Sequence, residues 1–125
     1  MELLNSFYKI LNFDESETDK LSALIKIDKF HPIFKGHFPN HPVTPGVCTM
    51  QIIKELSEKW SGKNLMLKTA RNVKFMAIIN PELNEDVQFE LQFEQMNSDE
   101  ISVKTNVLIE ENPALKFSGV FQILQ

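Results

Sequence analysis

Apolar and polar residues alternate along much of the chain, which is the pattern of β-strands with one buried face. The alternation is regular in four segments, residues 21–27, 87–93, 101–109 and 115–123. Turn-forming residues at 97–99 and 112–113 separate the last three segments. Successive strands joined by short turns pair antiparallel, so the pattern predicts an antiparallel sheet. Gly119 interrupts the last strand and is a candidate β-bulge.

Three other segments depart from this regular alternation. Residues 64–79 form a long apolar-rich run that closes at Asn80-Pro81, and we expect a further strand there. Residues 7–13 fit either a strand or a short helix. The four prolines within residues 29–45 exclude a long helix or a central strand, so we expect a loop.

One helix is expected, at residues 46–60. It opens after Pro45 and ends near Gly62, a residue type that favours a helix stop. Apolar side chains surround the axis in the first two turns and narrow to a stripe later, so we expect the helix to begin enclosed and to emerge toward solvent. Gln51 falls in the enclosed half, where its amide needs hydrogen-bond partners. Because the sheet needs a cover and this helix is the one sizeable candidate, the predicted fold class is α+β.

Composition narrows the class of protein. The 125 residues, 42% of them hydrophobic, fit one domain (residues 1–125) with one core. The net charge of -4 argues against a nucleic-acid binder with a wholly basic surface. Cys48 is the single cysteine, which excludes an internal disulfide and fits a reducing compartment. Neither a leader-like N-terminus nor a membrane-spanning run is recognisable, so we expect a cytoplasmic protein without membrane partners.

The helix start carries the candidate chemistry. Gly46 has no side chain, so a ligand oxygen can approach its N–H, which has no partner within the helix and carries partial positive charge. His37 lies nine residues upstream, and a neutral imidazole near a polarised carbonyl can take a proton from the adjacent carbon. A solvated histidine and an ordinary turn are the alternatives. His31 and His41 share the loop, but no nearby Cys or Asp completes an obvious ligand set, so no metal site is expected.

The segment GHFPNHPVTPGV, residues 36–47, resembles the signature of the (3R)-hydroxyacyl-acyl-carrier-protein dehydratases of type II fatty-acid synthesis. That signature reads G-H-F-P-x-x-P-V-x-P-G-V, and the chain matches it at every fixed position. The resemblance extends over about residues 20–123. It implies the hot-dog fold, an antiparallel sheet of about five to six strands wrapped around one long central helix. It also implies a homodimer or a higher oligomer of dimers, in which each active site lies between two protomers and takes its histidine from one chain and its helix acid from the other.

The resemblance implies a reaction and its residues as well. The substrate would be a 3-hydroxyacyl thioester on the phosphopantetheine of acyl carrier protein, with no further cofactor, and loss of water would give the trans-2-enoyl thioester. His37 would take the proton beside the thioester carbonyl, and the Gly46 N–H would hold that carbonyl. Phe38, Pro45 and Val47 would complete the substrate-binding site.

Gln51 departs from the family. It stands where the family has a Glu or Asp that assists departure of the hydroxyl, and a glutamine has no proton to give at neutral pH. Glu55 follows four residues later, at a position where the family often has glutamine, so the two residues look exchanged. Because residues i and i+4 share a helix face, Glu55 is a candidate catalytic acid. The alternative is a solvated Glu55 paired with Lys59.

This exchange leaves three functions open. The leading one is the dehydratase. The second is a catalytically impaired acyl-thioester-binding relative, or the partner subunit of a heterodimer. The third is a hot-dog thioesterase, in which Glu55 would activate water. The N-terminus also lacks the Pro-His-Arg motif that the family usually has before its first strand.

Acyl carrier proteins are acidic, so their partners are expected to have a basic surface. Residues 54–74 carry a net charge of +4 in a chain of -4, and such asymmetry orients and speeds docking of an acidic partner. The candidate docking residues are Lys54, Lys59, Lys63, Lys68, Arg71 and Lys74. An ordinary solvated rim is the alternative.

Overall fold

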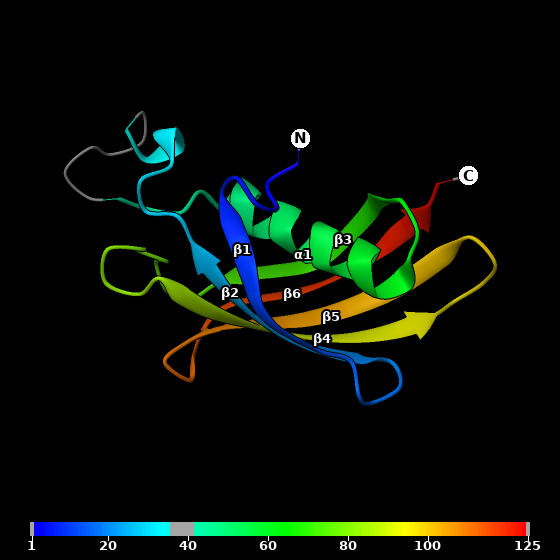
Figure 1. Cartoon of the computed structure of the whole chain (residues 1–125). Helices are drawn as coiled ribbons and strands as arrows, with labels where there is room; N and C mark the ends of the chain where they lie inside the picture. Colours follow the sequence, from blue (N-terminus) through cyan, green and yellow to red (C-terminus); the bar gives the residue numbers. More distant parts are fainter. Residues whose placement is uncertain (1, 36–41, 125) are drawn as a thin grey trace.

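The computed structural model describes residues 2–35 and 42–124. Its elements are β1 (Tyr8–Asp14), β2 (Lys20–Ile27), η1 (Pro32–Phe34), α1 (Gly46–Ser61), β3 (Leu65–Phe75), β4 (Asp86–Gln95), β5 (Glu100–Ile109) and β6 (Asn112–Ile123). The six strands form one antiparallel sheet in the order β1-β2-β4-β5-β6-β3. The sheet curves around α1, which lies against one of its faces (Figure 1). The predicted α+β architecture is therefore confirmed.

The strands form where the alternation predicted them. In β4, Val87, Phe89, Leu91 and Phe93 are at most 4% exposed, whereas the residues between them are half-buried or exposed. The ambiguous N-terminal segment is a strand, β1. The apolar run that follows α1 is a strand only as far as Phe75, and the predicted loop contains the short 3-10 helix η1.

The bulge predicted at Gly119 lies in the neighbouring strand instead. Register shifts occur in β3 between Leu67 and Thr69 and between Ala70 and Asn72, and Gly119 pairs with Ala70. A β-carbon at Gly119 would lie 2.5 Å from the backbone oxygen of Thr69. This glycine therefore permits the close approach of β3 and adds no residue to β6.

Helix α1 is most buried in its middle. Ile52, Ile53 and Leu56 are at most 1% exposed. Cys48 and Ile52 share the face that packs into the core, because they are four residues apart. Val47 lies off that face and is 66% exposed. The prediction that the helix begins enclosed on all sides is thus wrong at its first turn, because the sheet covers only one side of the axis.

The end of α1 follows the prediction. Gly62 adopts a φ of 71°, in the left-handed region that favours glycine, and its N–H donates to the Glu58 carbonyl at 2.8 Å. Trp60 stacks on Phe93 of β4 with ring centroids 3.9 Å apart. This contact holds the last turn of the helix against the sheet.

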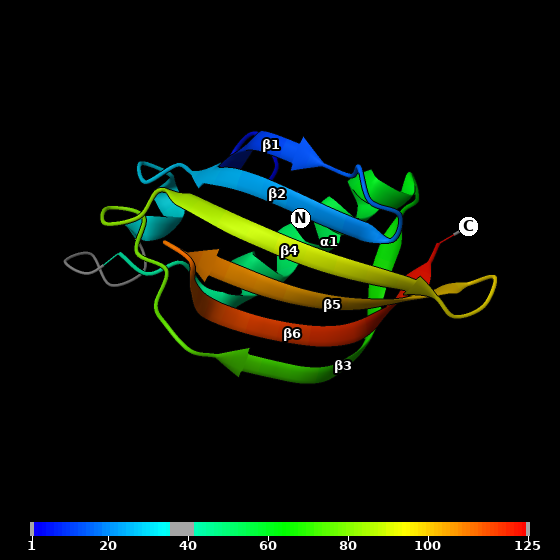
Figure 2. The ribbon, with the colours of Figure 1, turned by 90° about the horizontal axis from the view of Figure 1, so that it is seen from below.

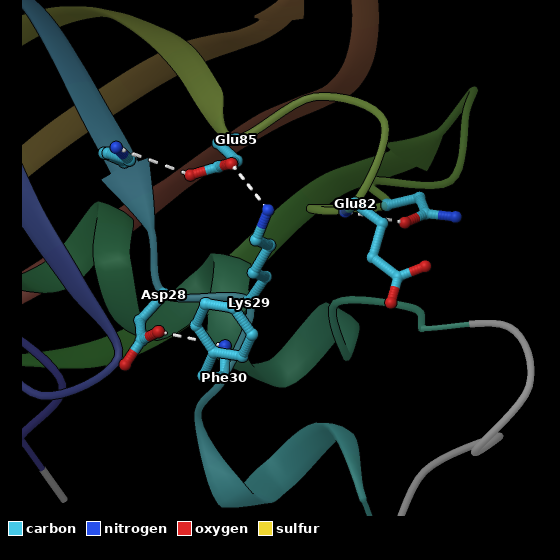
Figure 3. A network of polar contacts seen from close by, with 7 residues as sticks. Asp28, Lys29, Phe30, Glu82 and Glu85 are labelled. Carbon is cyan, nitrogen blue, oxygen red and sulfur yellow. Dashed lines mark hydrogen bonds and ion pairs between the residues drawn. The ribbon is translucent and has the colours of Figure 1, made fainter.

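Two loops lie at the end of the molecule where α1 begins, one after β2 and one between β3 and β4 (Figures 1 and 2). Lys29 pairs with Glu85 at 3.2 Å, and the Asp28 carboxylate accepts a hydrogen bond from the Phe30 N–H at 2.9 Å (Figure 3). Lys26 also pairs with Glu85, at 3.5 Å. The hydrogen bond from Lys29 lowers the pKa of Glu85. These contacts tie the start of the loop that follows β2 to the start of β4.

Strand β3 forms one edge of the sheet, opposite β1 (Figure 2). Ten of its eleven residues are exposed, and they include the apolar Met66 and Phe75, at 52% and 59%. A long edge strand leaves a row of backbone N–H and C=O groups open to pairing with another chain.

Candidate functional site at the start of the central helix

The first turn of α1 borders a cavity of about 360 Å³. The cavity lies between the segment that leads into α1 and the segment that leaves β3. Its lining is mainly apolar, and includes Val43, Phe75, Met76, Ile78, Ile79 and Leu115. The Thr44 N–H donates to the Ile79 carbonyl at 2.9 Å, which fixes one wall against the other.

Gly46 lines this cavity and lies against an aromatic ring. A β-carbon at Gly46 would lie 2.8 Å from Cζ of Phe75, so any other residue would have to displace the ring. The Pro45 carbonyl accepts hydrogen bonds from the N–H groups of Cys48 and Thr49, at 2.9 and 3.3 Å. The Gly46 N–H precedes these first intrahelical bonds, which makes it available to an acceptor from outside the helix.

Of the five residues predicted to hold substrate and take its proton, three follow one another at this helix start: Pro45, Gly46 and the exposed Val47. The other two, His37 and Phe38, lie outside the described residues.

Thr44 adds a polar group to the lining that the sequence did not reveal. The residue is 6% exposed, and its Oγ1 is buried with no hydrogen-bond partner among the residues that the structure describes. A buried unpaired hydroxyl costs about 1–3 kcal/mol. A single threonine in a proline-rich loop gives no sequence signal for such a placement.

The Glu55 carboxylate lies beneath the N-terminal segment and is 8% exposed. Its Oε1 accepts hydrogen bonds from the Leu4 N–H at 2.8 Å and from the Tyr8 hydroxyl at 3.0 Å. Its Oε2 accepts from the Leu3 N–H and from Nε2 of Gln51, both at 2.8 Å. Two donors on each oxygen fill the ordinary accepting capacity of a carboxylate.

The predicted alternative for Glu55, a solvated pair with Lys59, is wrong. The N-terminal segment covers the carboxylate, as the bonds from Leu3 and Leu4 show. The ammonium of Lys59 lies instead over the ring of Phe13 in β1, 5.4 Å from its centroid.

Gln51 is oriented by the Glu55 carboxylate. A carboxylate oxygen can only accept, so the Gln51 atom that faces it at 2.8 Å is the amide nitrogen. The carbonyl Oε1 of Gln51 therefore lies on the opposite side of the amide. The structure brings Gln51 and Glu55 together as the helical spacing predicted, with the glutamate on the buried side.

Tyr8 is the group beside Glu55 that sequence reasoning missed. It is 2% exposed, and burial, then the charge of Glu55 and the hydrogen bond to it, raise the pKa of Tyr8 well above its ordinary value. Tyr8 therefore remains a protonated donor throughout the neutral range. No sequence signal could have paired it with Glu55, because residues 7–13 fitted two kinds of element.

Of the other two loop histidines, His41 lies outside the described residues and His31 has a structural role. His31 Nδ1 accepts from the Ile33 N–H at 3.1 Å and so caps η1, and its ring packs edge-on against Phe7. Cys48 is buried, which raises the pKa of its thiol. Within residues 2–35 and 42–124, no three His, Cys, Asp or Glu side chains are grouped so that they could hold a metal ion. No helix in the same ranges is long and apolar enough to cross a membrane.

The predicted docking residues fall on two elements. Lys54 and Lys59 lie on α1, Lys63 follows it, and Lys68, Arg71 and Lys74 lie on β3. The first three line a groove of about 540 Å³ together with Gln51. Lys68 pairs with Glu100 of β5. The groove therefore links the helix-side lysines, and not those of β3, to the Gln51 side chain.

Known proteins resemble this chain in sequence. Residues 14–118 match the model of a family described as ApeI-like, ApeI dehydratase. The 3-hydroxyacyl-[acyl-carrier-protein] dehydratase FabZ of Lactiplantibacillus plantarum is 32% identical over 92 residues, which are 65% of this chain and 63% of that protein. FabZ of Haemophilus influenzae is 27% identical over 112 residues, 90% of this chain and 69% of that protein. The chain thus spans less than two thirds of the length of the first relative.

Solved structures share the fold. The dehydratase heterocomplex ApeI:P from Xenorhabdus doucetiae superposes with a TM-score of 0.71 at 15% identity, over 93% of this chain and 96% of that one. A mutant of the thioesterase PA1618 from Pseudomonas aeruginosa superposes with a TM-score of 0.63 at 10% identity, over 92% of this chain and 81% of that one. These identities show the fold alone, and it is the predicted hot-dog fold. The match of the family model over residues 14–118, which is most of the chain, shows that the chain belongs to the ApeI-like dehydratase family.

Proposed function

We propose that this protein eliminates water from a 3-hydroxyacyl thioester carried by acyl carrier protein, which yields the trans-2-enoyl thioester. The observation that carries the proposal is the helix start, where the family signature runs directly into Gly46 on the wall of an apolar cavity. A thioester substrate needs a donor for its carbonyl and apolar space for its chain. The Gly46 N–H and the apolar cavity beside it are the proposed donor and the proposed space.

The proposed reaction begins when His37 takes the proton from the carbon beside the thioester carbonyl, while the Gly46 N–H stabilises the negative charge on that carbonyl. The bond between carbon 3 and the hydroxyl oxygen breaks as the double bond forms. Gln51 holds the departing hydroxyl but has no proton to give. The protonated His37 therefore returns its proton to that hydroxyl, and water leaves with the enzyme unchanged.

The cavity beside Gly46 is proposed to receive the acyl chain. Its volume of about 360 Å³ is within the usual range of small-molecule sites, about 300–1,000 Å³. Phe75 and Ile78 on its wall are apolar and exposed, so a bound chain would cover surface that water now contacts. Substrates of increasing chain length would show where KM stops falling, which marks a filled cavity.

The acyl carrier protein is proposed to dock beside the groove lined by Lys54, Lys59 and Lys63, because this groove reaches Gln51. Reversing the charge of Lys54 and Lys63 to Glu should raise KM for the carrier-bound substrate and leave kcat nearly unchanged. A substrate on free pantetheine, which has no acidic carrier, is the control and should be insensitive to the reversal.

Two protomers are proposed to pair through the β3 edge, since β3 offers an open backbone edge with exposed apolar side chains. Val73, near the end of β3, is 37% exposed. Val73→Lys should convert the dimer to a monomer in sedimentation experiments. The same change at the other sheet edge, Leu11→Lys in β1, should not, and a dimer that survives Val73→Lys would exclude this interface.

One assay tests the proposed reaction. Purified protein is given a 3-hydroxyacyl carrier-protein substrate, and both the enoyl product and the free acid are measured. Enoyl product should form, and His37→Ala should reduce it by at least ~10²-fold. His31→Asn is the matched control, since an asparagine oxygen can replace the η1 cap acceptor, and it should retain most of the activity.

The same assay decides between this proposal and its competitors. Free acid in place of enoyl product would make the protein a thioesterase. Bound substrate without turnover would make it an acyl-thioester-binding relative or the partner subunit of a heterodimer. Gln51 is the residue that favours this second function, because it cannot supply the proton that a Glu or Asp would.

A further inference from the structure

A further pocket of about 370 Å³ lies where the N-terminal segment, the end of β2 and the residue before β4 meet. We propose that it binds a nucleotide, with the phosphate held by the lysines of its wall and the base stacked on an exposed aromatic ring. These wall residues are Lys9, Lys26, Lys29 and Phe30. The pocket shares no lining residue with the cavity beside Gly46 or the groove beside Gln51, so the inference does not rest on the proposed function.

Two lysines of this pocket lie directly opposite each other in the sheet. Lys9 of β1 is the register partner of Lys26 of β2. Their neighbours Tyr8 and Ile27 are buried in the core, so both lysine side chains project from the other face of the sheet. Like charges directly opposite each other destabilise a pair of strands. An anion bound between the two ammonium groups would remove this repulsion.

The carboxylates of the chain compensate the lysine charges only in part. Glu85 is shared, since it pairs with Lys26 at 3.5 Å and with Lys29 at 3.2 Å. Lys9 makes no ion pair with the residues that the structure describes. Three ammonium groups thus line a pocket in which one carboxylate pairs with two of them. A phosphate monoester carries about −1.5 to −2 charges at neutral pH and can serve several ammonium groups at once.

Phe30 supplies an aromatic surface beside these charges. It is 79% exposed, the highest value among the large apolar residues that the structure describes. The Asp28 carboxylate also lines the pocket, and it accepts a hydrogen bond from the Phe30 N–H at 2.9 Å, which fixes the backbone that carries the ring (Figure 3). The Lys29 ammonium lies 5.4 Å from the ring centroid. A planar base can therefore stack on the ring while its phosphate stays close to the lysines.

The charges and the ring together select the class of ligand. Inorganic phosphate would use only the lysines, and an uncharged aromatic molecule would use only the ring. A nucleotide carries both groups, a phosphate for Lys9 and Lys26 and a base for Phe30. Asn5 and Ser6 also line the pocket, and their side chains can hydrogen-bond the sugar that joins the two groups.

Isothermal titration calorimetry at low salt tests the pocket with ADP as the probe. ADP should bind at least ~10-fold more tightly than inorganic phosphate or adenosine, because each of these has only one of the two groups. Added salt should weaken the binding, since the phosphate contacts are ionic. A free nucleotide and the nucleotide end of a larger cofactor share this chemistry, so coenzyme A is titrated separately, and the tighter of the two identifies the source.

Two variants and two controls assign the binding to this pocket. Phe30→Ala and Lys9→Ala should each weaken ADP binding by at least ~5-fold, and both side chains are exposed, so neither change should prevent folding. Leu83→Ala is the matched control for the ring, because Leu83 is 77% exposed on the loop before β4 and lies outside the pocket. Lys20→Ala is the control for the charge, because Lys20 is an exposed lysine of β2 that pairs with Glu17. Both controls should change the affinity by less than ~2-fold.

Three results would overturn the proposal. The first is the absence of ADP binding up to millimolar concentration. The second is inorganic phosphate that binds as tightly as ADP, which would show an adventitious ion only. The third is ADP binding that both Phe30→Ala and Lys9→Ala leave unchanged, which would place the nucleotide elsewhere on the protein.

Discussion

Tyr8 gives the most direct physical test of the buried network, because it is the single tyrosine of the chain. Its hydroxyl donates to Glu55 at 3.0 Å, and the residue is 2% exposed. Loss of the phenolic proton would place a second negative charge beside the Glu55 carboxylate in a buried site. Burial, the charge of Glu55 and the hydrogen bond all raise the pKa of Tyr8 in the folded protein.

The sign of the pH dependence follows from this shift. The folded pKa of Tyr8 lies above the unfolded value of about 10, so the fold favours the protonated phenol. The resulting stabilisation is fully present below about pH 10 and is lost as the pH rises toward the folded pKa. In that window, the free energy of unfolding should fall by about 1.4 kcal/mol for each pH unit. Two units would remove about 2.7 kcal/mol, a large part of the stability of an ordinary domain.

The assay follows phenolate absorbance and circular dichroism together between about pH 9 and pH 12. Phenolate should appear only as the secondary structure is lost, well above the ordinary midpoint. Tyr8→Phe is the control, since lysines titrate equally in both proteins, and it should lack the contribution of about 1.4 kcal/mol for each unit. A phenolate midpoint near 10 with unchanged circular dichroism would refute the buried hydrogen bond.

Two further predictions each compare the stability of a pair of variants, first at two glycines and then at a buried and an exposed position of α1. Gly119→Ala should lower the free energy of unfolding by about 1–3 kcal/mol and speed amide exchange in β3, because the new methyl group would meet the Thr69 carbonyl. Gly62→Ala is the comparison, because a β-carbon there contacts no other atom. Its positive φ should lower the free energy of unfolding by about 1 kcal/mol, while amide exchange in β3 stays as slow as in the wild type. In denaturant unfolding, Ile53→Ala should lower the free energy of unfolding by about 2–5 kcal/mol, because Ile53 is buried. Val47→Ala should lower it by less than about 0.5 kcal/mol, because Val47 is exposed. Equal losses would contradict the burial of α1.

The arrangement of strands and helix was predictable because each strand has one buried face. Because apolar residues recur at every second position, the sequence indicates which side chains enter the core. Burial follows this alternation in β4 at Val87, Phe89, Leu91 and Phe93. Gly62 marked the helix end for an equally local reason, its left-handed conformation.

The failures all involve contacts between distant segments. Gly119 in β6 predicted a β-bulge in that strand, but the extra residues of the bulges lie in β3. Strand β3 pairs with β6 although the two are some fifty positions apart in the sequence. Val47 looked enclosed because its neighbours are apolar, yet the sheet covers only one side of the helix. The donors to Glu55 from the N-terminal segment were not recognisable, because two of them are backbone N–H groups and every residue other than proline has such a group.

The N-terminal segment gives a physical reason for a carboxylate at position 55 and an amide at position 51. Leu3, Leu4 and Tyr8 direct three donors at position 55, and a glutamine there would turn its NH2 group toward at least one of them. These donors therefore require a carboxylate at position 55. Once that carboxylate is fixed, a second one at position 51 would lie beside it with no proton between them, whereas the Gln51 amide donates to it at 2.8 Å. A glutamine at position 51 therefore fits beside a carboxylate at position 55 that already accepts three hydrogen bonds from the N-terminal segment.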